Sequence, residues 1–241
     1  MKLLNISCLT IFTAVLLLTA CQKRGTFEVP CKIETVYSNI NGDDENTATF
    51  TYNGWGDPVT IIQSNPTTGR PHYYFTYDSN HRLKTWKSDY GGSDFVEYYT
   101  KYYYDNNNFI VRDTTWFQGA NINDLSTFGS RIVSDYAYDS KGRVSKVTIT
   151  YVGAPIPPIE KVYTYDAHDN LIRAGATYDN KTNYLRTSLV LAFMMRDYSK
   201  NNVYAATSYN SKNLPTAFSA GGRPPLFNTP ISSITYTCDS H

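Results

Sequence analysis

One seven-residue stretch recurs along this chain, and its residue types predict a tight turn between two strands. The stretch YDSNHRL (77–83) returns as YDSKGRV (138–144) and as YDAHDNL (165–171). Seven segments align with it, beginning at Tyr52, Tyr77, Tyr104, Tyr138, Tyr165, Arg196 and Tyr209. Such recurrence indicates that one supersecondary unit is repeated, so the repeat constrains the fold more than any other feature does.

Two positions of the repeat, numbered here 1 to 7, carry the chemistry of a turn. Position 2 is always Asp or Asn, whose side chain bonds the backbone two residues further on: Asn53, Asp78, Asp105, Asp139, Asp166, Asp197 and Asn210. Position 5 holds residues that tolerate positive φ: Gly56, His81, Asn108, Gly142, Asp169 and Asn213, with Asn201 taken as the equivalent residue after Arg196. Each repeat therefore predicts a β-hairpin, and we assign both positions a structural role.

The strands that enter these turns alternate as half-buried strands do. One face of the sheet is expected to carry Tyr73, Phe75, Tyr77, Tyr98, Tyr102 and Tyr104, and the other Tyr74, Thr76, Tyr99, Lys101 and Tyr103. Two strands per hairpin predict an all-β protein, an antiparallel meander of about a dozen strands or more. Because open sheets rarely exceed about ten strands, we expect the meander to be curled or closed into a barrel-like sheet.

One segment departs from the strand pattern. Leu189–Met195 is the most apolar run after the N-terminal region. It predicts a short helix or plug near 187–200, with Thr187 or Ser188 as N-cap and Asn201 near the end. A further buried strand is the alternative, because periodicity does not separate the two over so short a run.

The N-terminus is typical of a lipoprotein signal. Lys2 precedes an apolar run from Leu9 to Leu18, and the sequence LTAC ends at Cys21. This matches the lipobox of bacterial lipoproteins, so we predict a signal peptide over 1–20, a lipidated Cys21 with a tether over 21–30, and a single β domain over 31–241. An uncleaved anchor helix or a plain secretory signal is the alternative.

The expected location is the outer membrane. Residue 22 is Gln rather than the Asp that retains lipoproteins in the inner membrane. Lipid on Cys21 would anchor the protein stably, since several acyl chains bind a bilayer far more strongly than one. The sequence leaves open whether the protein faces the periplasm or the cell surface.

Two cysteines remain for a structural role once Cys8 and Cys21 are assigned to the N-terminal region. Cys31 and Cys238 stand at the two ends of the predicted domain, and the expected compartment is oxidising. We expect a disulfide between them that joins the first and last strands. Two free thiols, or a bond to a partner, are the alternatives.

The motif at Tyr138 to Val144 resembles the YD repeat of RHS-type proteins. Small Gram-negative lipoproteins of unknown function resemble the chain more fully, through Cys21, Cys31, Tyr163–Asp166, Tyr198–Val203 and Tyr236–Cys238. The resemblance covers nearly all of the predicted domain and implies a barrel-like antiparallel β fold. It implies no activity. The toxin-enclosing role of large RHS proteins does not transfer to so short a chain.

Composition and spacing indicate neither catalysis nor metal binding. The net charge of +1 argues against nucleic acid as a partner. The four histidines show no metal-ligand spacing, and no Gly-x-Ser-x-Gly elbow occurs. Most Asp residues are turn formers. We therefore predict a protein that is not an enzyme and uses no metal or cofactor.

Aromatic side chains are the remaining candidates for binding, because exposed Trp and Tyr stack on sugars or anchor protein partners. The ligand-binding candidates are Trp55, Trp86, Tyr74, Tyr99 and Tyr103. Spacing along the strands places Trp86 on the face opposite Leu83, and Trp116 on the same face as Ile110.

Two functions follow as hypotheses. The first is a monomeric, membrane-anchored lipoprotein that binds a glycan, a peptide or an apolar small molecule without catalysis. The second is a structural or accessory envelope protein that binds a protein partner. A hydrolase is a third and weaker reading.

Overall fold

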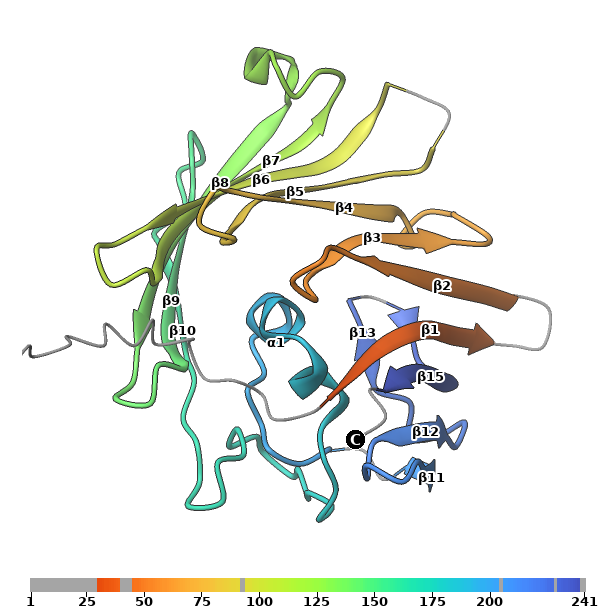
Figure 1. The fold of residues 1–241 in the computed structure, drawn as a ribbon. Helices are drawn as coiled ribbons and strands as arrows, with labels where there is room; N and C mark the ends of the chain where they lie inside the picture. Colours follow the sequence, from red (N-terminus) through yellow and green to blue (C-terminus); the bar gives the residue numbers. More distant parts are fainter. Residues whose placement is uncertain (1–29, 40–44, 92–93, 204–205, 228, 239–241) are drawn as a thin grey trace, which may run out of the picture.

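The computed structural model describes residues 30–39, 45–91, 94–203, 206–227 and 229–238, which form a strongly curled antiparallel sheet around a short helix, α1 (Figure 1). The 13-stranded sheet has the order β10-β9-β8-β7-β6-β5-β4-β3-β2-β1-β15-β12-β11, and β13 pairs separately with β14. The predicted all-β meander is confirmed. The sheet is curled rather than closed, since β10 and β11 end the ladder.

The strands are Cys31–Asn39 (β1), Glu45–Tyr52 (β2), Pro58–Gln63 (β3), His72–Tyr77 (β4), Leu83–Asp89 (β5), Val96–Tyr104 (β6), Ile110–Gly119 (β7), Ser130–Tyr138 (β8), Val144–Tyr151 (β9), Ile159–Val162 (β10), Ala206–Tyr209 (β11), Pro215–Phe218 (β12), Pro225–Leu226 (β13), Thr229–Pro230 (β14) and Ser233–Cys238 (β15). Leu189–Met195 is α1, and Leu125–Thr127 and Tyr184–Thr187 are 3-10 helices. Within these described ranges, no helix is long and apolar enough to cross a bilayer. The predicted signal peptide, Cys21 and the tether up to residue 29 lie outside the described residues.

Six repeats in the described ranges form the same turn, and Asp78 illustrates it. Its amide donates to the carbonyl of Arg82 at 2.9 Å, and its carboxylate accepts from the amides of Asn80 and Arg82 at 2.9 and 3.0 Å. Position 5 is left-handed in each turn: Gly56 (φ 88°), His81 (59°), Asn108 (62°), Gly142 (74°), Asp169 (66°) and Asn213 (60°). The six turns, at 53–57, 78–82, 105–109, 139–143, 166–170 and 210–214, are called the turn row below.

The segment at Arg196 is not a seventh hairpin. The left-handed residue there is Arg196 itself (φ 53°), which ends α1. The Asp197 carboxylate still accepts from the amide of Ser199 at 2.9 Å, so the local Asx chemistry forms without a hairpin. The prediction of a turn with Asn201 at its left-handed position is wrong, because the apolar run before it folds as a helix and supplies no incoming strand.

Five of the six turns are followed by a β-bulge that the alternation pattern did not reveal. The ladder shifts between Thr76 and Tyr77, and equivalent shifts occur at Tyr52, Tyr104, Tyr138 and Tyr209. A bulge adds one residue to one strand and reverses the facing of the residues beyond it.

The bulge overturns the expected placement of two tryptophans. Trp86 packs on the concave face, on the same side as Leu83, against Tyr73 and Tyr98 at ring-centroid distances of 5.9 and 6.0 Å. Trp116 lies on the outer face with Tyr99 and Val96, away from Ile110. The expected grouping of Tyr73, Phe75, Tyr77, Tyr102 and Tyr104 on one face is confirmed, since all five pack into the main core.

Most of the tyrosines at position 1 bond the neighbouring hairpin, whereas Tyr209 donates to the Asp179 carboxylate at 2.8 Å. Where it bonds the neighbouring hairpin, the hydroxyl donates to the position-7 carbonyl of the hairpin before it in the sheet: Tyr77 to Pro58 (2.7 Å), Tyr104 to Leu83 (2.6 Å), Tyr138 to Ile110 (2.8 Å) and Tyr165 to Val144 (3.5 Å). Position-6 side chains cover these rings, with Arg82 over Tyr104 at 4.4 Å and Arg143 over Tyr165 at 3.8 Å. Adjacent hairpins are therefore fastened by side chains as well as by strand pairing.

β1 and β15 together form one more hairpin, called the split hairpin below. The Cys31–Cys238 disulfide joins its two strands in place of a turn. Ile33 pairs with Tyr236 as position 7 pairs with position 1 elsewhere, and the same bulge follows Ile33. Tyr236 donates to the carbonyl of Pro215 at 2.8 Å, and Tyr52 donates to that of Ile33 at 2.7 Å. The predicted Cys31–Cys238 bond is confirmed. It joins the first and last strands inside the sheet and does not close it.

Helix α1 fills the concave side of the sheet, as the apolar run predicted (Figure 1). Ser188 caps its N-terminus, and Leu191 and Ala192 are fully buried. At its other end the Arg196 guanidinium bonds the hydroxyl of Tyr136, which donates to Asp113. A buried polar network thus fixes α1 to β7 and β8.

Residues 178–202 link the two open edges at the end of the sheet that carries the turn row. The Lys200 amide donates to the carbonyl of Asp169 at 3.1 Å, and Asn201 exchanges hydrogen bonds with Asn170. On the other side the Thr182 amide donates to the carbonyl of Asn213 at 3.1 Å. Turns 166–170 and 210–214 are therefore connected although their strands do not pair.

We predict that Tyr104→Phe destabilises the fold by about 1–2 kcal/mol, because the Leu83 carbonyl loses its hydroxyl donor in a half-buried setting. Urea unfolding of both proteins measures the difference. Tyr103→Phe is the matched control, since that neighbouring ring lies 46% exposed on the outer face. Equal stabilities for the Tyr104 and Tyr103 variants would contradict a structural role for the position-1 hydroxyl.

We also predict that Cys31→Ala with Cys238→Ala lowers the free energy of unfolding by about 2–5 kcal/mol, because the bond closes a very long loop in the unfolded chain. Thermal and urea unfolding with and without reductant provide the measurement. Reductant should destabilise the wild type and leave the double variant unchanged.

Candidate functional site

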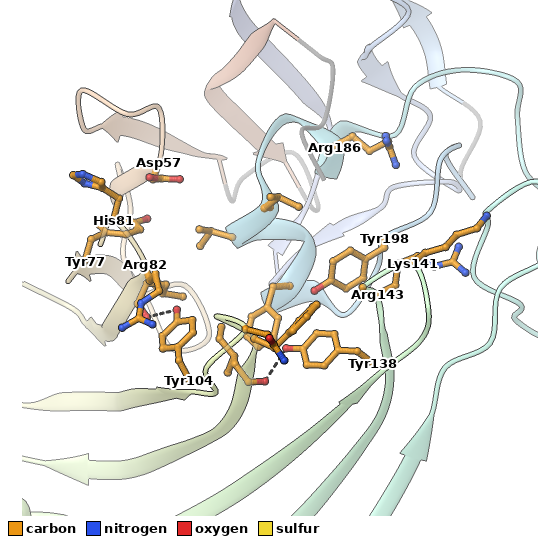
Figure 2. Close-up of a pocket in the computed structure, with 18 of the residues that line it drawn as sticks. Asp57, Tyr77, His81, Arg82, Tyr104, Tyr138, Lys141, Arg143, Arg186 and Tyr198 are labelled. Carbon is orange, nitrogen blue, oxygen red and sulfur yellow. Dashed lines mark hydrogen bonds between the residues drawn. The ribbon is translucent and has the colours of Figure 1, made fainter. Parts of the chain in front are cut away.

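A groove of about 910 Å³ lies between α1 and the turn row (Figure 2). Its walls come from two sources far apart in the sequence, the hairpin turns and the segment that carries α1. The lining residues are Asp57, Tyr77, His81, Arg82, Leu83, Tyr104, Asn107, Phe109, Ile110, Tyr138, Ser140, Lys141, Gly142, Arg143, Asp169, Arg186, Leu189, Val190, Phe193 and Tyr198. Figure 2 shows His81 and Arg82 on one side of α1, and Lys141 and Arg143 on the other.

Apolar and aromatic surface makes up the inner part of the groove. Leu83 and Ile110, both at position 7, are almost fully buried beneath it. Leu189, the first residue of α1, lines the groove and is 37% exposed. The rings of Tyr104 and Tyr138 face the same space. Their hydroxyls already donate to backbone carbonyls.

Charged residues at the rim are paired with one another. Arg82 bonds Asp78 at 2.7 Å and the Asn108 side chain at 2.8 Å. Arg143 bonds Asp139 at 2.7 Å and Asp169 at 2.9 Å. The hydrogen bond from Lys141 lowers the pKa of Asp169. The guanidinium groups of Arg82 and Arg143 therefore line the groove with their charge neutralised by carboxylates. Each is stacked on a tyrosine ring, Arg82 on Tyr104 and Arg143 on Tyr165.

Asp57 differs from the other rim carboxylates. Burial raises its pKa above the ordinary range, although the Asn53 side chain and the nearby His81 and Lys32 oppose that effect. The His81 ring packs against Trp55 with a ring-centroid distance of 4.0 Å and an interplanar angle of 39°. Among the described residues, no three His, Cys, Asp or Glu side chains gather as metal ligands would.

The five aromatic residues proposed from the sequence lie in three separate places. Trp55 is 70% exposed at the tip of turn 53–57, and Trp86 packs inside the concave face. Tyr74, Tyr99 and Tyr103 lie on the outer face, where Lys87 covers Tyr74 at 4.8 Å and Tyr99 packs on Trp116 at 6.0 Å. None of the five is among the residues that line the groove.

Sequence reasoning missed the residues that do form the groove. Position 6 of four successive hairpins lines it, through Asp57, Arg82, Phe109 and Arg143. The repeat alignment contained this signal. Positions 2 and 5 are restricted to turn-forming residues, whereas position 6 changes between acidic, basic and aromatic residues. The contribution of α1 had no comparable signal, since it depends on where the helix packs.

No protein-family model matches this chain, and no curated protein is significantly similar to it in sequence. The resemblance to YD-repeat lipoproteins rests on the motifs quoted above. Function is therefore argued from the groove itself.

We predict that Asp139→Asn lowers stability at pH 7 and that this difference shrinks as the pH falls below about 4. Burial raises the pKa of Asp139, but the hydrogen bonds from Arg143 outweigh it and the pKa lies below its ordinary value. A lowered pKa in the folded state stabilises above the unfolded value, and the contribution is lost as pH falls through the folded value. Asn keeps the oxygen that accepts from the turn amides of Lys141 and Arg143, and it removes both the charge and the second oxygen that accepts from the Arg143 guanidinium.

Urea unfolding at pH 7 and pH 3 tests this prediction. Asp105→Asn serves as the control, because position 6 of that turn is Phe109, whose side chain carries no charge. A stability difference for Asp139→Asn that stays the same at both pH values would show that its charge contributes nothing.

Proposed function

We propose that this chain is an outer-membrane-anchored lipoprotein that binds a small ligand without catalysis in the groove between α1 and the turn row. The observation that carries the proposal is the groove's size and lining. A volume of about 910 Å³ lies within the range of small-molecule sites, roughly 300–1,000 Å³. About half of its lining residues are aromatic or apolar, among them Leu83, Ile110, Leu189 and Phe193, and most of the others are charged or polar. Apolar walls with polar groups that can fix orientation are typical of small-molecule sites.

The arrangement supports binding better than it supports chemistry. Tyr77, Tyr104 and Tyr138 each donate to a carbonyl, and Arg82 and Arg143 each hold a carboxylate. Groups engaged in this way hold the walls of the groove in fixed positions. A pre-formed, rigid site reduces the ordering cost of binding.

The signal peptide, the lipid on Cys21 and the outer-membrane location remain part of this proposal. Their support is the LTAC sequence that ends at Cys21 and the Gln at position 22. We propose a monomer, with the membrane as the partner of the lipid anchor.

A second candidate function is the binding of a protein partner at the open edge of the sheet. β10 is exposed along its whole length, and Val162 and Ile172 are 69% and 60% exposed near it. An edge strand with exposed apolar side chains is a template for strand addition. This observation favours an accessory envelope role and does not involve the groove.

A thermal-shift screen against glycans, bile acids, fatty acids and short peptides separates the two candidates. We expect one class to raise the melting temperature of the wild type by several degrees, as a ligand bound only to the folded state does. Leu189→Asp should abolish the shift, because it places a charge on the apolar wall. Ile172→Asp, an exposed apolar site outside the groove, should retain it.

If no ligand class shifts the melting temperature, the groove proposal fails and the β10 edge becomes the stronger candidate. A shift that survives Leu189→Asp would place the ligand elsewhere on the molecule.

A further inference from the structure

The N-terminal tether enters the domain at the same rim that bounds the groove. Cys31 and Lys32 occupy positions 5 and 6 of the split hairpin, because Ile33 and Tyr236 pair as positions 7 and 1. Lys32 lies 5.6 Å above the ring of Tyr52, just as Arg82 covers Tyr104 in the groove wall. The tether therefore enters the domain at the same end of the sheet as the turn row.

Covalent geometry limits how far this rim can lie from an anchor at Cys21. The nine residues from 22 to 30 span at most about 30 Å when fully extended. That distance is comparable to the thickness of the hydrocarbon core of one bilayer. A lipid on Cys21 would therefore hold the turn row, and with it the groove, close to the membrane surface.

The chemistry of the groove favours a ligand that is recognised by its carbon body. The phenol hydroxyls of Tyr77, Tyr104 and Tyr138 are committed to backbone carbonyls. A sugar presents hydroxyls on every side and needs hydrogen-bond partners at each one that is buried. The exposed Leu189 and the ring faces of the wall instead match an apolar chain.

We propose that the ligand of this groove is the acyl chain of a lipid, taken from the membrane to which the protein's own N-terminus is tethered. This inference rests on the binding function proposed above and names the ligand class and its source. The membrane is inferred as the source of the ligand from the position of the tether. An acyl chain is inferred as the ligand class from the engaged tyrosine hydroxyls and the exposed Leu189.

Trp55 provides a reporter for the orientation that this proposal requires. Its side chain is 70% exposed at the tip of the turn next to the split hairpin. Indole rings are enriched at the boundary between membrane and water. Trp86 and Trp116 pack against other rings, so they report a folded domain rather than membrane contact.

The first experiment tests the ligand class. The full-length chain carrying Cys21→Ser, which has no lipid of its own, is titrated with the fluorescent fatty acid cis-parinaric acid and, separately, with maltohexaose. We expect saturable binding of the fatty acid and at least a tenfold loss of affinity in Leu189→Asp. Leu189→Ser should lose less, and Ile172→Asp should match the parent chain.

The outcomes separate the ligand class from the binding function. Binding of maltohexaose but not of the fatty acid, with loss in Leu189→Asp, would keep the binding groove and overturn the acyl-chain assignment. Binding of neither probe would overturn both. Fatty-acid binding that is unchanged in both Leu189 variants would place the site outside the groove and also overturn the inference.

The second experiment tests the source of the ligand. The lipid-modified wild type is placed on vesicles that contain brominated phospholipids, which quench nearby indoles. We expect quenching that is lost in Trp55→Phe, together with transfer of a labelled phospholipid between vesicle populations that Leu189→Asp abolishes. Quenching that persists in Trp55→Phe, or its absence in the wild type, would show that the turn row does not face the bilayer and would overturn the membrane source.

Discussion

The hydrogen bond from a tyrosine hydroxyl to the backbone of the neighbouring hairpin is the interaction on which the rest of this fold depends. A β-bulge interrupts strand pairing at five of the six hairpins and leaves a backbone group without its usual partner. The hydroxyls of Tyr77 and Tyr104 reach such carbonyls, at Pro58 and Leu83. The same tyrosine ends its own strand and begins its own turn. Tyrosine at position 1 thus supplies a hydrogen-bond donor to a carbonyl at the bulge and joins two hairpins. This double role accounts for its recurrence at the first position of the repeat.

This dependence extends to the hairpin that β1 and β15 form. The hairpin made by Ile33 and Tyr236 keeps the pairing, the bulge and both tyrosine bonds of the other repeats. Only its turn is missing, and Cys31–Cys238 stands in that place. Without the covalent bond, two strands from opposite ends of the chain would have to find each other at the entropic cost of a very long loop. The disulfide therefore keeps β1 and β15 together as neighbouring strands within the sheet, and it does not close a barrel.

Local chemistry was predictable from the sequence, and long-range placement was not. The Asx residue and the left-handed residue of turns such as 78–82 act within five residues, so their types reveal them. The apolar run Leu189–Met195 likewise predicted a short helix or plug, with a further strand as the alternative, and it forms α1. The bulge defeated the strict alternation that had placed Trp86 and Trp116, because one extra residue reverses every side chain beyond it. The groove depends on α1 packing against hairpins from another part of the chain, and no sequence pattern encodes that contact directly.

The repeat separates residues that build the turn from residues free to change the groove. Position 6 takes part in the turn through its backbone amide, which Arg82 and Phe109 each donate to an Asp carboxylate. The guanidinium groups of Arg82 and Arg143 add a side-chain bond to the turn carboxylate, whereas Phe109 adds none. The amide bond forms with any side chain at this position, and the side chains of Arg82 and Phe109 project over the ring of the next hairpin, at the rim of the groove. Asp57, Arg82, Phe109 and Arg143 occupy this position in succession. An acid, two guanidinium groups and an aromatic ring can alternate there without disturbing the bulge or its tyrosine. Differences in ligand preference among chains built from this repeat should thus arise first at position 6.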